Sequence, residues 1–250
     1  MKIYAYQIDT VSGALTPVPG SPFAVTGTPG NSCTPADMVL TPNQQFFYTA
    51  CQNFGNDNGE AVAGFSVNSS NGALTALSGS PYPATVGGAV YGLVITPDGN
   101  HLFGLSLNSP SGPCPLDMWS VGSNGALVYS SGAPYQSSNF ASQFTGQITP
   151  DAKFLYIGVP QDSNSTEGVS IVPLAATTAV PNIGASTEFS ATGGQFGDTK
   201  LSVDTRYLAV GTSAITHVYN RNLTTGALSE IGTGSALAGT GVVEIVQVAN

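Results

Sequence analysis

The sequence predicts an all-β fold, a β-propeller built from four-stranded antiparallel blades. Two motifs that recur about every 53 residues predict this fold, and so does the composition. Only 8% of the residues are charged while 41% are hydrophobic, and 31 Gly and 17 Pro are spread along the chain. Such a mixture is typical of short buried strands joined by tight turns, and not of helices.

The first motif combines a glycine turn with a short strand and, in its three clear copies, a proline followed by an aromatic residue. The copies are SGALTPVPGSPF from Ser12, NGALTALSGSPY from Asn71, NGALVYSSGAPY from Asn124 and, more loosely, TGALSEIGTGSA from Thr225. Their glycines are 59, 53 and 101 residues apart. The last step equals two repeats, so we expect a degenerate copy between them.

The second motif alternates with the first and reads as a β-turn between two apolar strands. Its copies are TPNQQFFY from Thr41, TPDGNHLF from Thr96, TPDAKFLY from Thr149 and SVDTRYLA from Ser202, at steps of 55, 53 and 53 residues. Proline fixes φ at the second turn position, and Asp or Gly tolerates the turn that follows. Each unit therefore predicts a strand, this turn, an aromatic strand, a variable loop, a third strand, the glycine turn and a fourth strand.

Four strands per unit at this period match the blades of a propeller. One blade cannot bury both of its faces, so we expect a single domain over residues 1–250 in which the blades pack around an axis. Aromatic residues at equivalent third-strand positions are expected in the core between blades: Tyr6, Phe65, Trp119 and Tyr219. The chain opens in a third strand near Ile3–Ile8 and ends in a first strand near Val242–Val248, which makes about five blades' worth of sequence.

The paired motifs resemble those of the lactonase-type β-propellers, the family that includes the bacterial propeller form of 6-phosphogluconolactonase, and those of the YVTN-type repeat proteins. The resemblance covers about residues 3–248. It implies a seven-bladed ring, of which this chain would supply about five blades, and the alternative is a five-bladed ring closed through an incomplete blade. An open ring would leave unpaired strand edges, which natural proteins seldom expose.

Charge and hydropathy limit the classes of partner. Five Lys and Arg against fourteen Asp and Glu give a net charge of −9, so no basic surface is expected for nucleic acid, and few cations are available for a phosphorylated substrate. No stretch approaches the eighteen apolar residues of a membrane span, and no signal peptide follows Met1. A surface rich in Ser, Thr and Asn favours a periplasmic or secreted location, with a cytoplasmic one left open.

Acidic residues at equivalent first-strand positions are the candidates for a ligand site in the central channel. Asp37 and Asp198 each lie four residues before the second motif, and Glu244 lies near the equivalent place in the last strand. Carboxylates that converge on one channel can bind a ligand or raise one another's pKa. The alternative is that they are solvated channel residues without a specific role.

Two other groups of residues are candidates for metal binding and for a disulfide. The polar loops that contain Asp57 and Glu60, and Asp162 and Glu167, offer oxygen ligands without the spacing of an EF-hand, so solvated loops are the alternative and no metal or other cofactor is expected. Cys33 and Cys51 flank a predicted hairpin and either form a disulfide or remain two buried thiols.

Function is predicted by elimination and by the resemblance. The sequence has no GxSxG elbow, no HExxH and no phosphate-binding glycine loop. We therefore expect a non-catalytic extracytoplasmic propeller that binds a small molecule, a carbohydrate or a protein on its channel face. The alternative implied by the resemblance is a lactone hydrolase, similar to 6-phosphogluconolactonase, that acts on a sugar lactone.

Overall fold

The computed structural model of the chain describes residues 1–27, 33–52, 61–84, 89–107, 114–136, 145–159, 168–175, 178–182, 185–190, 196–212 and 215–235. Within these ranges the regular elements are β-strands, and none is an α-helix. The predicted all-β class is therefore confirmed. The same ranges hold no helix with the length and hydrophobicity needed to cross a membrane.

Four antiparallel sheets of consecutive strands follow one another through the described part of the chain. Sheet A contains β5 (Thr34–Leu40), β6 (Phe46–Gln52), β7 (Ala61–Val67), β8 (Leu74–Ala76) and β9 (Tyr82–Pro83), where β8 and β9 both pair with β7. Sheet B contains β10 (Ala89–Ile95), β11 (His101–Leu107), β12 (Leu116–Val121) and β13 (Leu127–Tyr129). Sheet C contains β14 (Gly146–Ile148), β15 (Phe154–Val159), β16 (Gly168–Pro173) and β17 (Thr187–Ser190). Sheet D contains β18 (Phe196–Leu201), β19 (Tyr207–Thr212), β20 (Ile215–Arg221) and β21 (Leu228–Ser235).

The N-terminal strands form two smaller pairs. β1 (Lys2–Ile3) pairs with β4 (Phe23–Ala24), and β2 (Tyr6–Ile8) pairs with β3 (Leu15–Pro17). The single strand expected over Ile3–Ile8 is thus interrupted after Ile3. At the interruption the backbone N–H of Ala5 donates to the side-chain hydroxyl of Ser21 at 3.1 Å, and the N–H of Gly64 donates in the same way to Ser80 in the continuous strand β7.

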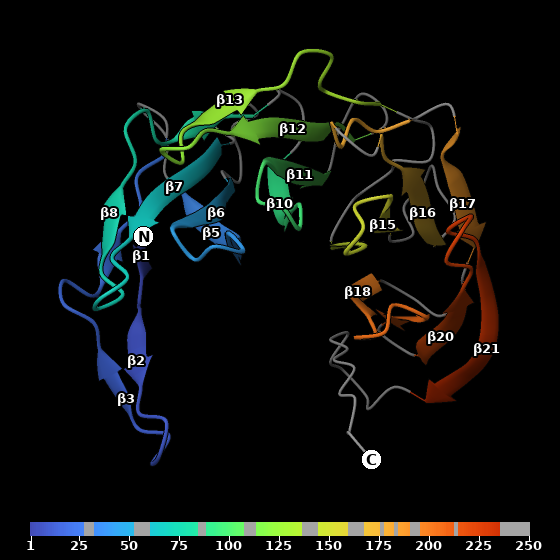
Figure 1. The fold of residues 1–250 in the computed structure, drawn as a ribbon, viewed down its shortest axis with the longest axis horizontal. Helices are drawn as coiled ribbons and strands as arrows, with labels where there is room; N and C mark the ends of the chain where they lie inside the picture. Colours follow the sequence, from blue (N-terminus) through green and yellow to red (C-terminus); the bar gives the residue numbers. More distant parts are fainter. Residues whose placement is uncertain are drawn as a thin grey trace.

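The sheets are arranged as an arc around a common centre (Figure 1). The first strand of each sheet lies innermost and the fourth lies at the outside, and the first strands of neighbouring sheets contact one another. This is the arrangement expected of propeller blades. The last predicted strand, Val242–Val248, lies outside the described residues, and the number of blades stays a prediction.

Apolar side chains fill the space between neighbouring sheets. Trp119 lies with Tyr48 and Leu102 between sheets A and B, and Tyr219 lies with Tyr156 and Leu208 between sheets C and D. Burying this apolar surface is the main favourable contribution to the fold.

The predicted aromatic series is buried in three copies and exposed in the first. Phe65, Trp119 and Tyr219 are 4%, 1% and 0% exposed, whereas Tyr6 is 47% exposed. The expectation that Tyr6 lies in the core was wrong, because the described residues place no sheet on its outer side.

Candidate functional site

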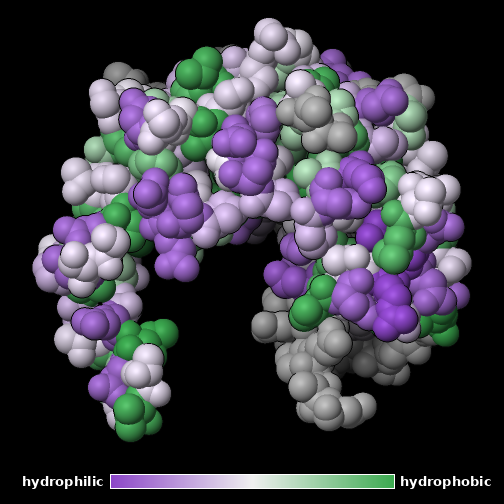
Figure 2. All heavy atoms as spheres, viewed as in Figure 1, coloured by the Kyte–Doolittle hydropathy of each residue, from purple (hydrophilic) through white to green (hydrophobic). Residues whose placement is uncertain are grey.

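A pocket of about 500 Å³ lies at the centre of the arc, where the first strands of all four sheets meet. We call it the axial pocket. It is lined by Ala36, Asp37, Met38 and Val39 of β5, Tyr91 and Leu93 of β10, Thr145, Gly146 and Gln147 at β14, and Asp198 and Lys200 of β18. Residues more than 160 positions apart in the sequence therefore share one wall. Figure 2 shows the molecule hollowed at this centre, with hydrophilic side chains along much of the inner side of the arc.

Irregular strand pairing recurs at the same place in three of the four first strands. The register shifts between Pro35 and Met38 in β5, between Val90 and Gly92 in β10, and between Phe196 and Asp198 in β18. A bulge leaves a residue outside the regular ladder and redirects its side chain, and bulges are frequent beside binding and active sites. Here they accompany Asp37, Tyr91 and Asp198, all of which line the pocket.

Asp37 holds two neighbouring first strands together. One carboxylate oxygen accepts a hydrogen bond from the backbone N–H of Met38 at 2.7 Å, and the other accepts from the N–H of Leu93 in sheet B at 2.8 Å. These bonds fix the carboxylate at the pocket wall. Acceptance from Leu93 also gives Asp37 a structural role that does not depend on a ligand.

Asp198 is the second acidic residue of the axial pocket. Its carboxylate accepts from the N–H of Thr199 at 2.8 Å and lies 3.6 Å from the ammonium group of Lys200. Burial raises the pKa of Asp198 above its ordinary value, and the charge of Asp37 adds to the rise, although Lys200 and the Thr199 N–H oppose it. A carboxyl group with a raised pKa in a pocket is a candidate for proton transfer or ligand binding.

The remaining polar lining is uncharged. Thr145 and Thr199 place their hydroxyl oxygens 3.1 Å apart across sheets C and D, and Gln147 donates to the Gly146 carbonyl at 3.0 Å. Together with the phenol ring of Tyr91, the pocket offers hydroxyl, amide and carboxylate groups on an otherwise apolar wall. This combination suits hydrogen bonding to a small molecule that carries several hydroxyl groups.

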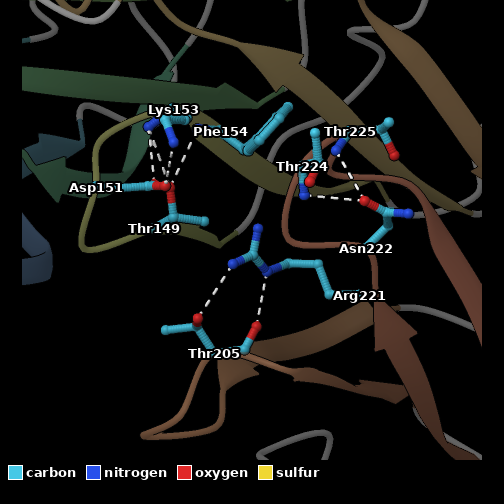
Figure 3. A network of polar contacts seen from close by, with 9 residues as sticks. All are labelled: Thr149, Asp151, Lys153, Phe154, Thr205, Arg221, Asn222, Thr224 and Thr225. Atoms are coloured by element: carbon cyan, nitrogen blue, oxygen red, sulfur yellow. Dashed lines mark hydrogen bonds and ion pairs between the residues drawn. The ribbon is translucent and has the colours of Figure 1, made fainter.

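Three further cationic side chains have their partners outside the axial pocket. Lys153 pairs with Asp151 at 3.2 Å and Arg206 pairs with Asp204 at 2.7 Å, both in turns of the second motif. The guanidinium of Arg221 donates to the backbone oxygen of Thr205 at 2.7 Å and to its hydroxyl at 3.1 Å, as Figure 3 shows. These bonds stabilise a turn in which Thr205 has a φ of 58°.

His217 also lies outside the pocket lining. It is buried in β20, where its Nδ1 lies 2.7 Å from a carboxylate oxygen of Glu230 and its ring stacks on Tyr219. Asp117 and Tyr129 form the equivalent pair between the third and fourth strands of sheet B. The repetition of this contact in two sheets indicates that it links strands.

The predicted site residues divide into two groups. The structure brings Asp37 and Asp198 into one pocket, whereas Glu244, Asp57, Glu60, Asp162 and Glu167 lie outside the described residues. The described residues hold no group of three or more His, Cys, Asp or Glu side chains that could bind a metal ion. Cys33 and Cys51 are joined by a disulfide, with their Cα atoms 4.6 Å apart.

Sequence reasoning missed Gln147 and Lys200. Both lie two residues after the position of Asp37 and Asp198 in the repeat, and side chains two apart on a strand point to the same face. The alternation of the strand was therefore a signal that could have found them.

Comparison with known proteins identifies the fold. No protein-family model and no curated protein matches the sequence. Among solved structures, a candidate 6-phosphogluconolactonase from Bacteroides uniformis matches 98% of this chain at a TM-score of 0.76 and 16% identity, and the match covers 68% of that chain. This chain therefore shares its fold with that structure.

Two further structures support the same fold. A protein from Lactobacillus plantarum matches at a TM-score of 0.67 and 18% identity, covering 96% of this chain and 65% of its own. The periplasmic gluconolactonase PpgL of Pseudomonas aeruginosa matches at 0.52 and 15% identity, covering 96% and 78%. The propeller described here thus spans about two thirds of the length of the first two structures.

Proposed function

We propose that the propeller binds a neutral polyhydroxylated small molecule, a sugar or a sugar lactone, in the axial pocket and acts as a ligand-binding scaffold. The observation that carries the proposal is that Asp37 and Asp198, from the first and last described sheets, line one pocket with Gln147 and Thr145. Carboxylates accept hydrogen bonds from hydroxyl groups, and such charge-assisted bonds are stronger than neutral ones.

The charge of the pocket supports a neutral ligand over a phosphorylated one. Lys200 is the one cationic side chain in the described lining, and Asp198 already neutralises it. Phosphate groups are usually bound by Arg, Lys or a helix N-terminus. Two carboxylates beside a single paired lysine would instead repel a phosphate.

The proposal includes a location outside the cytoplasm. The disulfide between Cys33 and Cys51 supports it, because such bonds persist in oxidising compartments and are rare in the cytosol. One of the structural neighbours is named a periplasmic gluconolactonase, which is compatible with this location.

A larger ring is the last part of the proposal. About five blades' worth of sequence is present, and the B. uniformis structure is matched over 68% of its length. We propose that the described sheets belong to a seven-bladed ring. The exposure of Tyr6, whose equivalents are buried, supports a neighbouring blade on that side.

Lactone hydrolysis is a second candidate function, favoured by the raised pKa of Asp198. A carboxylate of raised pKa is a better general base than an ordinary one, and it could activate water against a bound lactone. The Bacteroides and Pseudomonas neighbours are named as lactonases, which agrees with this candidate.

Calorimetric titration with neutral sugars and aldonic acids tests the binding proposal. We expect saturable binding that weakens at least tenfold in Asp198→Asn, because about 1.5–3 kcal/mol is typical of a hydrogen bond to a charged group. Asp151→Asn is the matched control, since Asp151 lies in a turn where the first repeat already carries Asn43. Binding that is absent, or that is equally weakened by both substitutions, would contradict the proposal.

A pH-stat assay with gluconolactone separates scaffold from enzyme. If Asp198 acts as a general base, turnover rises as the pH exceeds the raised pKa of Asp198 and is lost in Asp198→Asn, while Asp151→Asn keeps it. Turnover at the spontaneous rate, together with sugar binding, supports the scaffold alone.

A further inference from the structure

Neighbouring sheets make the same contact at two places in the arc. The glycine of the turn between third and fourth strands, Gly125 in sheet B and Gly226 in sheet D, lies under a phenylalanine of the preceding sheet. A Cβ atom at Gly125 would lie 2.4 Å from the ring of Phe46, and one at Gly226 would lie 2.5 Å from the ring of Phe154. Glycine is therefore needed so that the ring can pack against the turn.

A tyrosine two residues further along the same strand completes this contact. The hydroxyl of Tyr48 donates to the Gly125 carbonyl at 2.7 Å, and the hydroxyl of Tyr156 donates to the Gly226 carbonyl at 2.7 Å. The second strands of sheets A and C, β6 and β15, thus each place a Phe-x-Tyr sequence against the glycine turn of the next sheet. We call this pattern the Phe-x-Tyr contact.

Sheet A has the glycine turn and lacks the ring. Gly72 occupies the same turn position, yet within 4 Å of its Cβ position the described residues offer only Val18, at 3.2 Å. A groove of about 610 Å³ lies beside it, lined by Leu40, Phe46, Val67 and Gly72 together with polar residues of two turns. In sheet B the equivalents of three of these residues are covered: Ile95 and Val121 pack in the core between sheets A and B, and Gly125 lies under Phe46 of sheet A.

Exposed apolar surface around this groove also indicates that the described residues leave it uncovered. Leu40 is 45% exposed, whereas its equivalents Ile95 and Leu201 pack in the cores between sheets. Among the described strands, β1 and β2 each pair on one side only, with β4 and β3. In all four sheets A to D the equivalent third strand pairs with a second strand on its other side.

We propose that this groove binds a β-hairpin of the repeat's own type, whose second strand carries Phe-x-Tyr. The phenylalanine packs on Gly72, the tyrosine hydroxyl donates to the Gly72 carbonyl, and the strand pairs with the open edge of β1 and β2. Addition of a strand to an exposed edge, with pockets for alternate side chains, is a general mode of peptide recognition. The inference rests on the larger ring proposed above and specifies the chemistry of the segment that continues it.

A synthetic peptide of residues 145–159 provides the probe, because it contains the turn of sheet C with Phe154 and Tyr156. Fluorescence polarisation of the labelled peptide should show saturable binding to the full chain. We expect a Phe154→Ala peptide to bind at least tenfold more weakly and a Tyr156→Phe peptide to lose a smaller factor.

Two substitutions in the chain locate the binding site. Leu40→Asp places a charge in the groove and should weaken peptide binding at least tenfold. Leu223→Asp is the control, because Leu223 is 49% exposed and lies outside the groove, and this variant should leave peptide binding unchanged. Both leucines are exposed, so we expect both variants to fold, which circular dichroism verifies.

Three outcomes would overturn the inference. They are the absence of peptide binding, equal binding of the Phe154→Ala peptide, and a dimer in light scattering that Leu40→Asp dissociates while the peptide does not bind. The last result would assign the groove to a second copy of this chain. If the peptide fails while the axial pocket still binds sugar, the proposed ligand function stands without this inference.

Discussion

At the scale of single residues, the tyrosine hydroxyls that donate to glycine carbonyls are among the polar contacts that fix how one sheet lies on the next. Tyr48 is fully buried, and burial raises the pKa of its hydroxyl, which therefore stays protonated as a donor. Its bond to Gly125 spans 77 residues of sequence. Apolar packing alone has no such direction, so these bonds set the register between sheets.

Tyr48→Phe tests this role. The substitution keeps the ring and removes the donor to the Gly125 carbonyl, and we expect it to lower the free energy of unfolding by about 1–2 kcal/mol. Tyr4→Phe, at an exposed tyrosine, is the control and should change stability little. Urea denaturation measures both. Equal midpoints for Tyr48→Phe and the unmodified chain would show that the bond does not stabilise the fold.

Two residues of the axial pocket were predicted from the sequence, and their contacts were not. Asp37 and Asp198 were found because the repeat aligns them, and repetition converts a sequence offset into a position around the axis. The hydrogen bond from Leu93 to Asp37 was not foreseen, since it depends on a bulge in β10 that no residue pattern marks. Burial of Asp198 likewise follows from the neighbouring sheets and not from its own strand.

At the scale of elements, the turns of the second motif are determined locally and were predicted well. Thr96, Thr149 and Ser202 each donate a side-chain hydrogen bond to the aspartate two residues later. The residue directly after the aspartate has a positive φ in each turn, whether it is Gly99, Ala152 or Thr205. Because the contacts span only a few residues, the motif contains all the information that the turn needs.

The N-terminal and fourth strands were predicted less well, since their extent depends on distant partners. β8 and β9 are two short segments against β7 where one fourth strand was expected. In sheet C the glycine turn is replaced by a segment in which Leu174 bridges Pro181. A degenerate motif leaves no local signal, so only the pairing partner defines such a strand.

The disulfide supplies an element-scale prediction, because it joins the start of β5 to the end of β6. Closing a loop of 18 residues contributes roughly 3 kcal/mol on the chain-entropy estimate. We expect dithiothreitol, or the double variant Cys33→Ala/Cys51→Ala, to lower the free energy of unfolding by about that amount. Cys114→Ala leaves the bond intact and is the control for reductant sensitivity. A chain equally stable with and without reductant would contradict the prediction.

At the scale of the whole molecule, the turn carboxylates of successive sheets all make the fold less stable as the pH falls. Hydrogen bonds from Ser202 and Arg206 lower the pKa of Asp204 to about 2. For Asp98 and Asp151 partial burial raises the pKa, but hydrogen bonds from Thr96 and Thr149 and from neighbouring N–H groups lower it on balance. A carboxyl whose folded pKa is depressed stabilises the fold above its unfolded pKa, and this contribution is lost as the pH falls towards the folded pKa.

Acid should therefore destabilise sheets B, C and D together, and the loss should fall between the unfolded aspartate pKa of 3.8 and about pH 2. Asp204→Asn should flatten this decline, since Asn43 already serves in the first turn. Asp198 has the opposite sign, because its raised pKa favours the folded state as the pH falls, so Asp198→Asn should steepen the decline. Urea unfolding at a series of pH values between 2 and 7 measures these slopes. If both variants shift the slope in the same direction, the turn carboxylates and the pocket carboxylate do not differ as the structure requires.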